Sequence, residues 1–235
     1  MYRTTLLFSV LATSGAVPPL VHVKSSQSVF RSDAVRVPVE LGVMSRCPDA
    51  LLCEPIFDAV LQKVGEKVDL ELIYVAKYPP ELIQPTRTLA VTCLHGPGEC
   101  AGNVQQLCAA KYSTQWWDFV RCQNARGRYQ VGLPEVALEC AETVGIDWEG
   151  SGVGECAGLD GSGKGEEGVA LLRESTLRGK ALEIEKSCTV LINHRKVCIH
   201  DGTWKECEGG HGVDDFVRQI NSEYERLNGE FGGPY

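Results

Sequence analysis

The chain has 235 residues, of which 43% are hydrophobic and 23% charged, the composition of a globular protein with a full-sized core. Its 31 acidic residues outnumber its 23 lysines and arginines, which gives a formal net charge of −8 and excludes the broad positive surface of a nucleic-acid-binding protein. Eleven cysteines are too many for a reducing compartment unless they bind metal or react. Because this number is odd, full pairing leaves at least one sulfur free or joined to another molecule.

Residues 1–16 are expected to be a signal peptide, with a positive charge at Arg3, a short apolar run and a small-residue cleavage site at Ser14-Gly15-Ala16. Residues 17–33 contain two prolines and a Ser/Gln-rich run, which is typical of an extended lead-in. The apolar run of the signal peptide is too short to span a bilayer, and no later segment is long and apolar enough. We therefore expect a secreted or luminal protein without a membrane anchor.

A strand, a helix and a second strand are predicted at the start of the ordered chain. Apolar residues alternate from Val35 to Val43, which is typical of a strand with one buried face. A helix follows Cys47 and ends near Gly65, and residues 68–75 predict the second strand. The apolar positions of the helix recur in steps of four at Leu52, Ile56, Val60 and Val64. This order within about 40 residues predicts a βαβ unit with parallel strands.

The middle of the chain, about residues 76–168, is predicted to be a cysteine-rich helical insertion. It contains helical patterns at residues 103–112 and 134–144 and a glycine-rich loop at residues 150–168. A helix at 169–182, a hairpin of strands 189–192 and 196–200, and an amphipathic helix at 213–227 follow. The whole order predicts an α/β, thioredoxin-like fold with a disulfide-rich helical insertion, in a single domain over residues 34–230.

Cys47 is the leading candidate for a reactive residue, because it lies between a predicted strand and a helix that begins with Pro48. Backbone N–H groups at a helix N-terminus stabilise a thiolate, the species that attacks disulfides. Lowering a thiol pKa from about 8.5 to 5 requires almost 5 kcal/mol, whereas a helix terminus supplies at most about 2 kcal/mol. Asp49 would repel the thiolate, so further hydrogen bonds to the sulfur are needed. The alternative is a buried or disulfide-bonded structural cysteine.

Residues 93–108 carry a spaced motif. They resemble the signature of the gamma-interferon-inducible lysosomal thiol reductases, which is Cys-Gln-His-Gly, two residues, Glu-Cys, two residues, Asn, four residues and Cys. Only Leu94 departs from it, standing where the family has Gln. Cys122, Cys140 and the tripeptide at residues 155–157 are similar to further family cysteines.

The resemblance covers about residues 35–227. It implies a thioredoxin-like fold, a secreted or lysosomal or vacuolar location, and reduction of protein disulfides under acidic conditions. The spacing of Cys188, Cys198 and Cys207 is similar to that of secreted fungal-type members. The expected partners are protein substrates that contain disulfides and a small-molecule thiol as electron donor, and no cofactor or metal is expected.

Two departures from the family pattern concern the mechanism. Ala50 stands where the family has the second cysteine of a Cys-x-x-Cys pair, which normally releases the substrate. Cys53 does not replace it, because six residues along a helix span about 9 Å, beyond the roughly 7 Å limit between the Cα atoms of a disulfide. Cys53 is therefore expected to pair elsewhere or to pack in the core.

The second departure is Cys188, which stands before a strand where thioredoxin-like proteins usually place a cis-proline that faces the reactive cysteine. We expect Cys188 to lie beside Cys47 and to act as a displaced resolving thiol or to form a protective disulfide with it. The alternative is a hairpin disulfide from Cys188 to Cys198 or Cys207. The other ten cysteines are expected to form five pairs, or one pair fewer if Cys188 serves Cys47.

Two sets of residues have the composition of zinc sites: Cys93, His95, Cys100 and Cys108, and Cys198, His200, Cys207 and His211. In an oxidising compartment, disulfides are the favoured interpretation. His95 and Glu99 are then expected to hold the geometry of the insertion. Aromatic residues 116, 117 and 119 lie on a predicted helix and are expected to be buried, with contact to a substrate peptide as the alternative.

The sequence supports two hypotheses. The first is a thiol–disulfide oxidoreductase that reduces protein disulfides through Cys47 in a monothiol-like manner, with Cys188 or an external thiol completing the turnover. The second is a secreted binding or effector protein that keeps the scaffold without catalytic activity.

Overall fold

The computed structural model of the protein describes residues 34–77 and 91–229. The predicted signal peptide and the lead-in lie outside the described residues. The predicted extent of a single domain over residues 34–230 stays a prediction.

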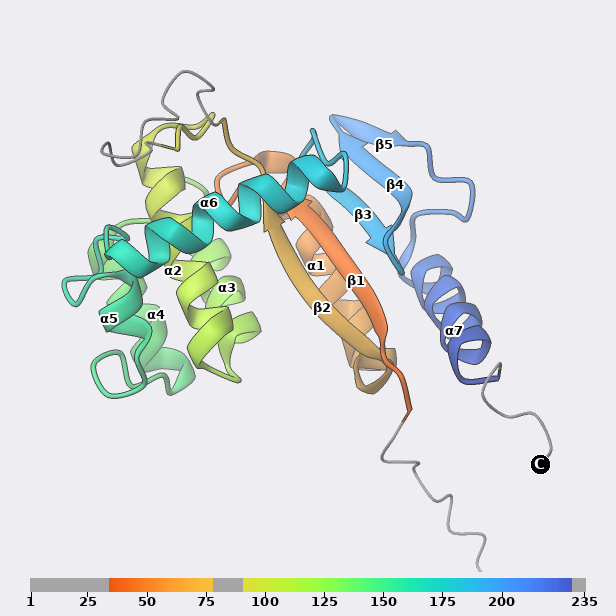
Figure 1. Ribbon diagram of the computed structural model, residues 1–235, viewed down its shortest axis with the longest axis horizontal. Helices are drawn as coiled ribbons and strands as arrows, with labels where there is room; N and C mark the ends of the chain where they lie inside the picture. Colours follow the sequence, from red (N-terminus) through yellow and green to blue (C-terminus); the bar gives the residue numbers. More distant parts are fainter. Residues whose placement is uncertain (1–33, 78–90, 230–235) are drawn as a thin grey trace, which may run out of the picture. The chain divides into compact units, whose positions relative to one another are not determined.

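A five-stranded mixed sheet forms the centre of the fold, with the strand order β2-β1-β3-β4-β5 (Figure 1). Strands β1 and β2 are parallel, with Val37 opposite Val68, and the remaining neighbours are antiparallel. The predicted βαβ unit and hairpin are confirmed. Strand β5 was not predicted, because three residues are too few to show an alternating pattern. The strands are β1 (Val37–Val43), β2 (Val68–Tyr74), β3 (Thr189–Ile192), β4 (Arg195–Asp201) and β5 (Thr203–Lys205).

Helices cover both faces of the sheet (Figure 1). Helices α1 (Pro48–Val64) and α7 (Val213–Gly229) pack against each other. Their buried apolar side chains form one hydrophobic core with the fully buried apolar side chains of β1. A short 3-10 helix, η1 (Gly65–Lys67), follows α1. Helix α6 (Glu166–Ala181) packs on β2, where Ile73 forms a second small core with Ile184 and Leu191.

The buried face of α1 differs from the predicted one. Leu52 is 56% exposed, whereas the side chains at positions 50, 53, 57, 60 and 64 are buried. A stripe with steps of four residues drifts around a helix of 3.6 residues per turn, so steps of three and four keep one face toward the core. The predicted extent of the helix is confirmed.

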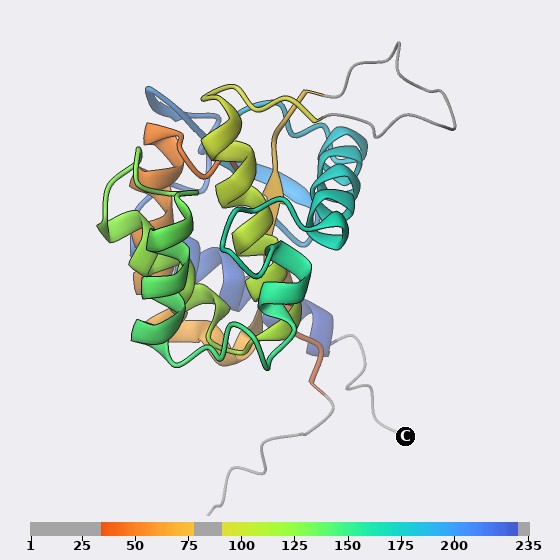
Figure 2. The same cartoon turned by 90° about the vertical axis from the view of Figure 1, so that its left-hand side faces the viewer.

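In the described part of the insertion between β2 and α6, four helices lie beside the sheet in Figure 1 and in front of it in Figure 2. They are α2 (Pro97–Tyr112), α3 (Trp116–Ala125), α4 (Pro134–Val144) and α5 (Val153–Ala157). Helix α2 begins six residues before the predicted start, and α5 lies in the predicted glycine-rich loop. Phe119 is fully buried, and the Trp117 indole donates a hydrogen bond to Asp58.

Disulfides brace this insertion and the sheet. Ten of the eleven cysteines, all within the described residues, form five disulfides, so the prediction of five pairs is confirmed. The pairs are Cys53–Cys188, Cys93–Cys100, Cys108–Cys156, Cys122–Cys140 and Cys198–Cys207. Among the helices in the described ranges, none has the length and apolar character to cross a membrane.

Gly132 tests how tightly the insertion packs. Its φ is +84°, and an added Cβ would lie 1.9 Å from the Gly98 carbonyl oxygen. We expect Gly132→Ala to lower the free energy of unfolding by about 2 kcal/mol more than Gly145→Ala. Gly145 is the matched control, because it has a similar φ of +78° and open space around its Cα. Chemical denaturation without reductant measures both variants, and equal losses would contradict the packing argument.

Candidate thiol active site

Cys47 is the N-cap residue of α1, and Pro48 occupies the first turn of this helix. The sequence predicts this position correctly, and Cys47 is the one free cysteine of the chain, all eleven being described. The residue is only 5% exposed, however, so the reactive candidate is a buried cysteine, as the alternative interpretation of the sequence has it. Cys47 belongs to the main hydrophobic core cluster, which also contains side chains of the sheet and of α1.

Two acceptors lie near the Cys47 sulfur. Sγ is 3.7 Å from Asp49 Oδ2 and 3.9 Å from the carbonyl oxygen of Ser187. A thiol has a single proton, so it donates to one of these acceptors at a time. Both contacts therefore favour the protonated thiol, which can donate a hydrogen bond to either acceptor.

The pKa of the Cys47 thiol is raised from its ordinary value. Burial is the main cause, and the negative charge of Asp49 adds to it. The Ser187 side chain acts in the opposite direction, as do the backbone N–H groups of Asp49 and Ala50 at the helix N-terminus, but burial outweighs all of them. A resting thiolate is thus not the state that this site favours, and attack by the sulfur requires a proton acceptor.

The position of the missing second cysteine is also buried. Ala50 has no exposed surface and lies in the first turn of α1. No other sulfur of the chain is free to take its place, since the remaining ten cysteines are bonded. In this folded state Cys47 is therefore the one free thiol among the eleven cysteines.

Cys188 has a different partner from either one predicted. It forms a disulfide with Cys53, with 6.5 Å between the Cα atoms, so neither the pairing with Cys47 nor a hairpin disulfide to Cys198 or Cys207 is present. The disulfide joins the segment before β3 to the second turn of α1, where Cys53 is fully buried. The Ser187–Cys188 peptide bond is cis, in the place where the fold pattern predicts a cis-proline.

The segment before β3 still faces the reactive sulfur. The Ser187 carbonyl contacts Cys47 Sγ, and the Ser187 hydroxyl accepts a hydrogen bond from the Met44 N–H at 3.1 Å. Cys188 therefore follows directly after a residue that touches the site, but its own sulfur is bonded to Cys53.

The spaced motif at residues 93–108 holds the loop that carries Cys47. Glu99 is fully buried, and its carboxylate accepts hydrogen bonds from the Arg46 N–H at 3.3 Å and from the His95 N–H at 3.1 Å. The His95 ring contacts the same carboxylate, and the Asn103 side chain accepts from the Ser45 N–H at 3.1 Å. His95 and Glu99 thus have the expected positioning role, but they position the β1–α1 loop as well as the insertion.

A contact between Asp49 and His200 was not predicted. His200 Nδ1 lies 2.6 Å from Asp49 Oδ1, and the Gly202 N–H donates to the same oxygen at 2.9 Å. The two side chains are 151 positions apart, and nothing in their local sequence indicates that β4 approaches the start of α1. The sequence indicates His200 only as a member of the second zinc-like set.

The two zinc-like sets of residues contain disulfides. Cys93 bonds Cys100, and Cys198 bonds Cys207, as the favoured interpretation expected. Within residues 34–77 and 91–229, no group of three or more His, Cys, Asp or Glu side chains is arranged to hold a metal ion.

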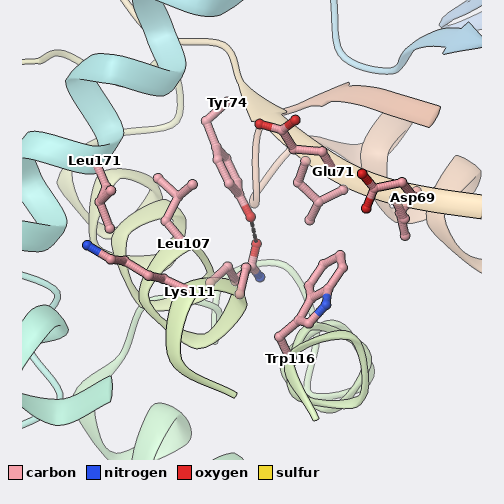
Figure 3. A pocket seen from close by; sticks show the side chains of 11 residues that line it. Asp69, Glu71, Tyr74, Leu107, Lys111, Trp116 and Leu171 are labelled. Atoms are coloured by element: carbon pink, nitrogen blue, oxygen red, sulfur yellow. Dashed lines mark hydrogen bonds between the residues drawn. The ribbon is translucent and has the colours of Figure 1, made fainter. Parts of the chain in front are cut away.

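A pocket of about 380 Å³ lies between β2 and the helices α2, α3 and α6 (Figure 3). Trp116, Leu107 and Leu171 contribute apolar walls, and Asp69, Glu71 and Lys111 contribute charge. Inside it, the Tyr74 hydroxyl donates a hydrogen bond to Gln106 at 2.7 Å. Neither Cys47 nor Cys188 lines this pocket, so it is separate from the thiol site.

The sheet, its helices and the cysteine at the start of α1 together define a thioredoxin-like α/β protein with a disulfide-rich insertion. Two solved structures agree with this class. They are MdbA, a thiol-disulfide oxidoreductase from Corynebacterium diphtheriae, and a candidate protein disulfide isomerase from Nitrosomonas europaea. Each is 11% identical to this chain, with TM-scores of 0.52 and 0.51, and each match covers 81% of this chain and 86% and 98% of the other. At this identity the likeness establishes the fold alone.

Sequence comparison shows similarity to one family of thiol reductases. Residues 38–144 match the family model of the gamma interferon inducible lysosomal thiol reductases. GILT-like protein 1 of Drosophila melanogaster is 27% identical over 180 residues, which cover 69% of this chain and 68% of that protein. These matches confirm the resemblance to this family and support a thiol–disulfide oxidoreductase at a general level.

One buried acid of α1 gives the fold a pH dependence. Glu54 is 3% exposed, and burial raises its pKa to about 8, against an ordinary value of 4.5. The Asn124 amide donates to one carboxyl oxygen, while the other oxygen and the Asn124 carbonyl have no partner. The folded state therefore binds the Glu54 proton more tightly than the unfolded state does.

Stability is expected to fall as the pH rises from about 4.5 to 8, because unfolding then releases this proton. One proton corresponds to a slope of about 1.4 kcal/mol per pH unit. We expect Glu54→Gln to reduce the slope by up to this amount, and Glu66→Gln, at an exposed position of the same segment, to leave it unchanged. Denaturant unfolding at pH 5, 6.5 and 8 measures the slopes. A slope in Glu54→Gln equal to that of the wild type would exclude Glu54 as the source.

Proposed function

We propose that this protein reduces disulfides of protein substrates through Cys47, in a monothiol manner. One observation carries the proposal: of eleven cysteines only Cys47 is unpaired, and it lies at the strand-to-helix junction of a thioredoxin-like fold. The family match supports the same general chemistry. The monothiol detail rests on Ala50, which has no sulfur to release a bound substrate.

The reaction takes place in three exchange steps. The Cys47 thiolate attacks one sulfur of the substrate disulfide, the substrate S–S bond breaks, and a mixed disulfide with Cys47 forms as one substrate thiol leaves. A small-molecule thiol then attacks the mixed disulfide. This attack regenerates Cys47 and leaves the donor bonded to the substrate sulfur. A second molecule of the same thiol then releases the second substrate thiol, and the two donor thiols have become one disulfide.

Cys188 provides a second route for completing the turnover. This route requires two external thiols to reduce the Cys53–Cys188 disulfide first, because Cys188 is otherwise bonded. Cys188 then attacks the mixed disulfide at Cys47 and releases the substrate, and Cys53 displaces Cys47 to restore the Cys53–Cys188 disulfide. Both routes consume two donor thiols for each substrate disulfide.

The proposed location is outside the cell or in a lysosomal or vacuolar lumen. Five disulfides fit an oxidising compartment, and the family has members named for the lysosome. The net charge of −8 disfavours nucleic acid as a partner. Proteins with accessible disulfides are the proposed substrates.

A catalytically inactive binding or effector protein is the alternative. It is favoured by the burial of Cys47, which leaves only 5% of this residue exposed, and by the raised pKa of its thiol. Both features slow attack on a large substrate unless the site opens or a base assists.

The Cys47→Ser variant separates the two functions. With a fluorogenic disulfide peptide as substrate and excess free cysteine as donor, at pH 5 and pH 7, we expect the variant to retain less than a tenth of the wild-type rate above background. The Cys53→Ser/Cys188→Ser double variant keeps Cys47 and loses the second route, so it measures how much of the turnover depends on Cys188. Equal rates for Cys47→Ser and the wild type would leave the binding function.

Restoring the missing cysteine provides the complementary test. We expect Ala50→Cys to form a disulfide with Cys47 after one turnover, so that in single-turnover experiments without a donor thiol it releases both substrate thiols. The wild type is expected to stop at the mixed disulfide under the same conditions. Mass spectrometry without reduction identifies these species, and release of both thiols by the wild type would contradict the monothiol mechanism.

A further inference from the structure

Asp49 connects the reactive sulfur to a buried histidine. One carboxylate oxygen, Oδ2, lies 3.7 Å from Cys47 Sγ, and the other, Oδ1, lies 2.6 Å from His200 Nδ1. Asp49 belongs to the first turn of α1 and His200 to β4. The carboxylate therefore spans the space between the helix that carries the thiol and the strand behind it.

The division of hydrogen bonds leaves Oδ2 available to the sulfur. Oδ1 receives two donors, His200 Nδ1 and the Gly202 N–H, which fix the plane and position of the carboxylate. The Asp49 side chain is 20% exposed, so a carboxylate there is desolvated only in part. An ionised Asp49 can then accept a proton from the thiol without losing its own partners.

The histidine is held from three sides. His200 is 6% exposed, its backbone N–H and carbonyl pair with Cys188 at 2.8 and 2.9 Å, and the Trp204 ring meets its ring edge-on at 4.8 Å. Trp204 in turn stacks on His211 at 5.1 Å. In the described part of the chain, the titratable groups along this line of contacts are Cys47, Asp49, His200 and, beyond the Trp204 ring, His211.

We propose that Asp49 is the base that takes the proton of the Cys47 thiol, and that His200 is the positioning residue that holds its carboxylate toward the sulfur. This inference rests on the proposed function of Cys47. It gives the buried sulfur a means of attack that the helix N-terminus does not supply alone, since burial raises the thiol pKa.

In each exchange at Cys47, Asp49 takes a proton from the attacking thiol and gives a proton to the leaving sulfur. Asp49 Oδ2 accepts the proton as Sγ attacks the substrate disulfide, and the departing substrate sulfur takes a proton from Asp49 as its S–S bond breaks. In the second step, the donor thiol attacks the mixed disulfide, and Asp49 takes and returns its proton in the same way. Asp49 is unchanged after a full cycle.

A purely repulsive role for Asp49 predicts the opposite change in Cys47 reactivity when the Asp49 charge is removed. If its charge acted only by repelling the thiolate, removing the charge would make Cys47 more reactive, because the Asp49 charge contributes to the raised thiol pKa. If Asp49 is the base, removing it makes Cys47 less reactive wherever the thiol form dominates. The sign of the change therefore decides between the two roles.

Alkylation of Cys47 by iodoacetamide measures this sign without a substrate or donor, because Cys47 is the one unpaired cysteine of the eleven. We expect Asp49→Asn to lower the alkylation rate at pH 5–6 by about tenfold or more. Asp201→Asn removes an exposed carboxylate from the same strand as His200, and is expected to keep the wild-type rate. An unchanged or faster rate in Asp49→Asn would overturn the proposal.

His200 is tested by its pH profile. His200→Asn keeps a side-chain N–H near the position of Nδ1 and is expected to retain the wild-type alkylation profile between pH 5 and 8. His200→Leu is expected to shift the alkylation profile toward that of Asp49→Asn. The unfolding temperatures of His200→Leu and His200→Asn are compared as a control for loss of stability. Identical profiles for His200→Leu and the wild type would remove the positioning role.

Reductase rates of the same variants separate this proposal from the proposed function. A normal alkylation rate in Asp49→Asn, with reductase activity that still depends on Cys47, would overturn only the role of Asp49 as the base. Slow alkylation in Asp49→Asn, with equal reductase rates for the wild type and Cys47→Ser, would keep the base and overturn the reductase function.

Discussion

A single buried carboxylate fixes the loop on which the thiol site depends. Glu99 has no exposed surface, and its oxygens bind the Arg46 and His95 N–H groups and the His95 ring. A buried carboxylate without such partners would be strongly destabilising, so α2 and the loop before Cys47 must form together. The spaced motif at residues 93–108 is thus a positioning device for a cysteine that lies outside it. No residue of the motif is among the hydrogen-bond partners of the Cys47 sulfur, which are Asp49 and Ser187.

The second constraint acts from the other side of the site. The Cys53–Cys188 disulfide ties α1 to the segment before β3, the same segment whose Ser187 carbonyl contacts Cys47. Thioredoxin-like proteins usually have a proline at this place, and here a covalent bond restrains the segment instead. Cys47 therefore lies between two elements that the insertion and a disulfide hold in place.

Local patterns in the sequence were sufficient for most of the scaffold. The alternation in β1, the start of α1 at Pro48 and the parallel pairing with β2 all depend on neighbouring residues, and the structure confirms them. The predicted buried face of α1 was wrong, because a strict repeat of four residues drifts around a helix of 3.6 residues per turn. Strand β5 was missed because it is short.

The site was less predictable, because its contacts join distant residues. The odd cysteine count and the strand-to-helix junction identified Cys47, but the partner of Cys188 depends on how the segment before β3 faces α1. The Asp49–His200 contact spans 151 positions and leaves no local pattern. Burial of the sulfur depends on side chains from several elements, so composition and spacing could not reveal it.

The Cys53–Cys188 link joins residues 135 positions apart and encloses the whole helical insertion. If a protease cuts the backbone once anywhere between these two residues, both fragments stay covalently attached to each other. The thiol on the first fragment and the histidine on the second would then remain parts of one molecule. In surroundings rich in proteases, the same sulfur–sulfur bond that shapes the site would also preserve the site in a nicked chain.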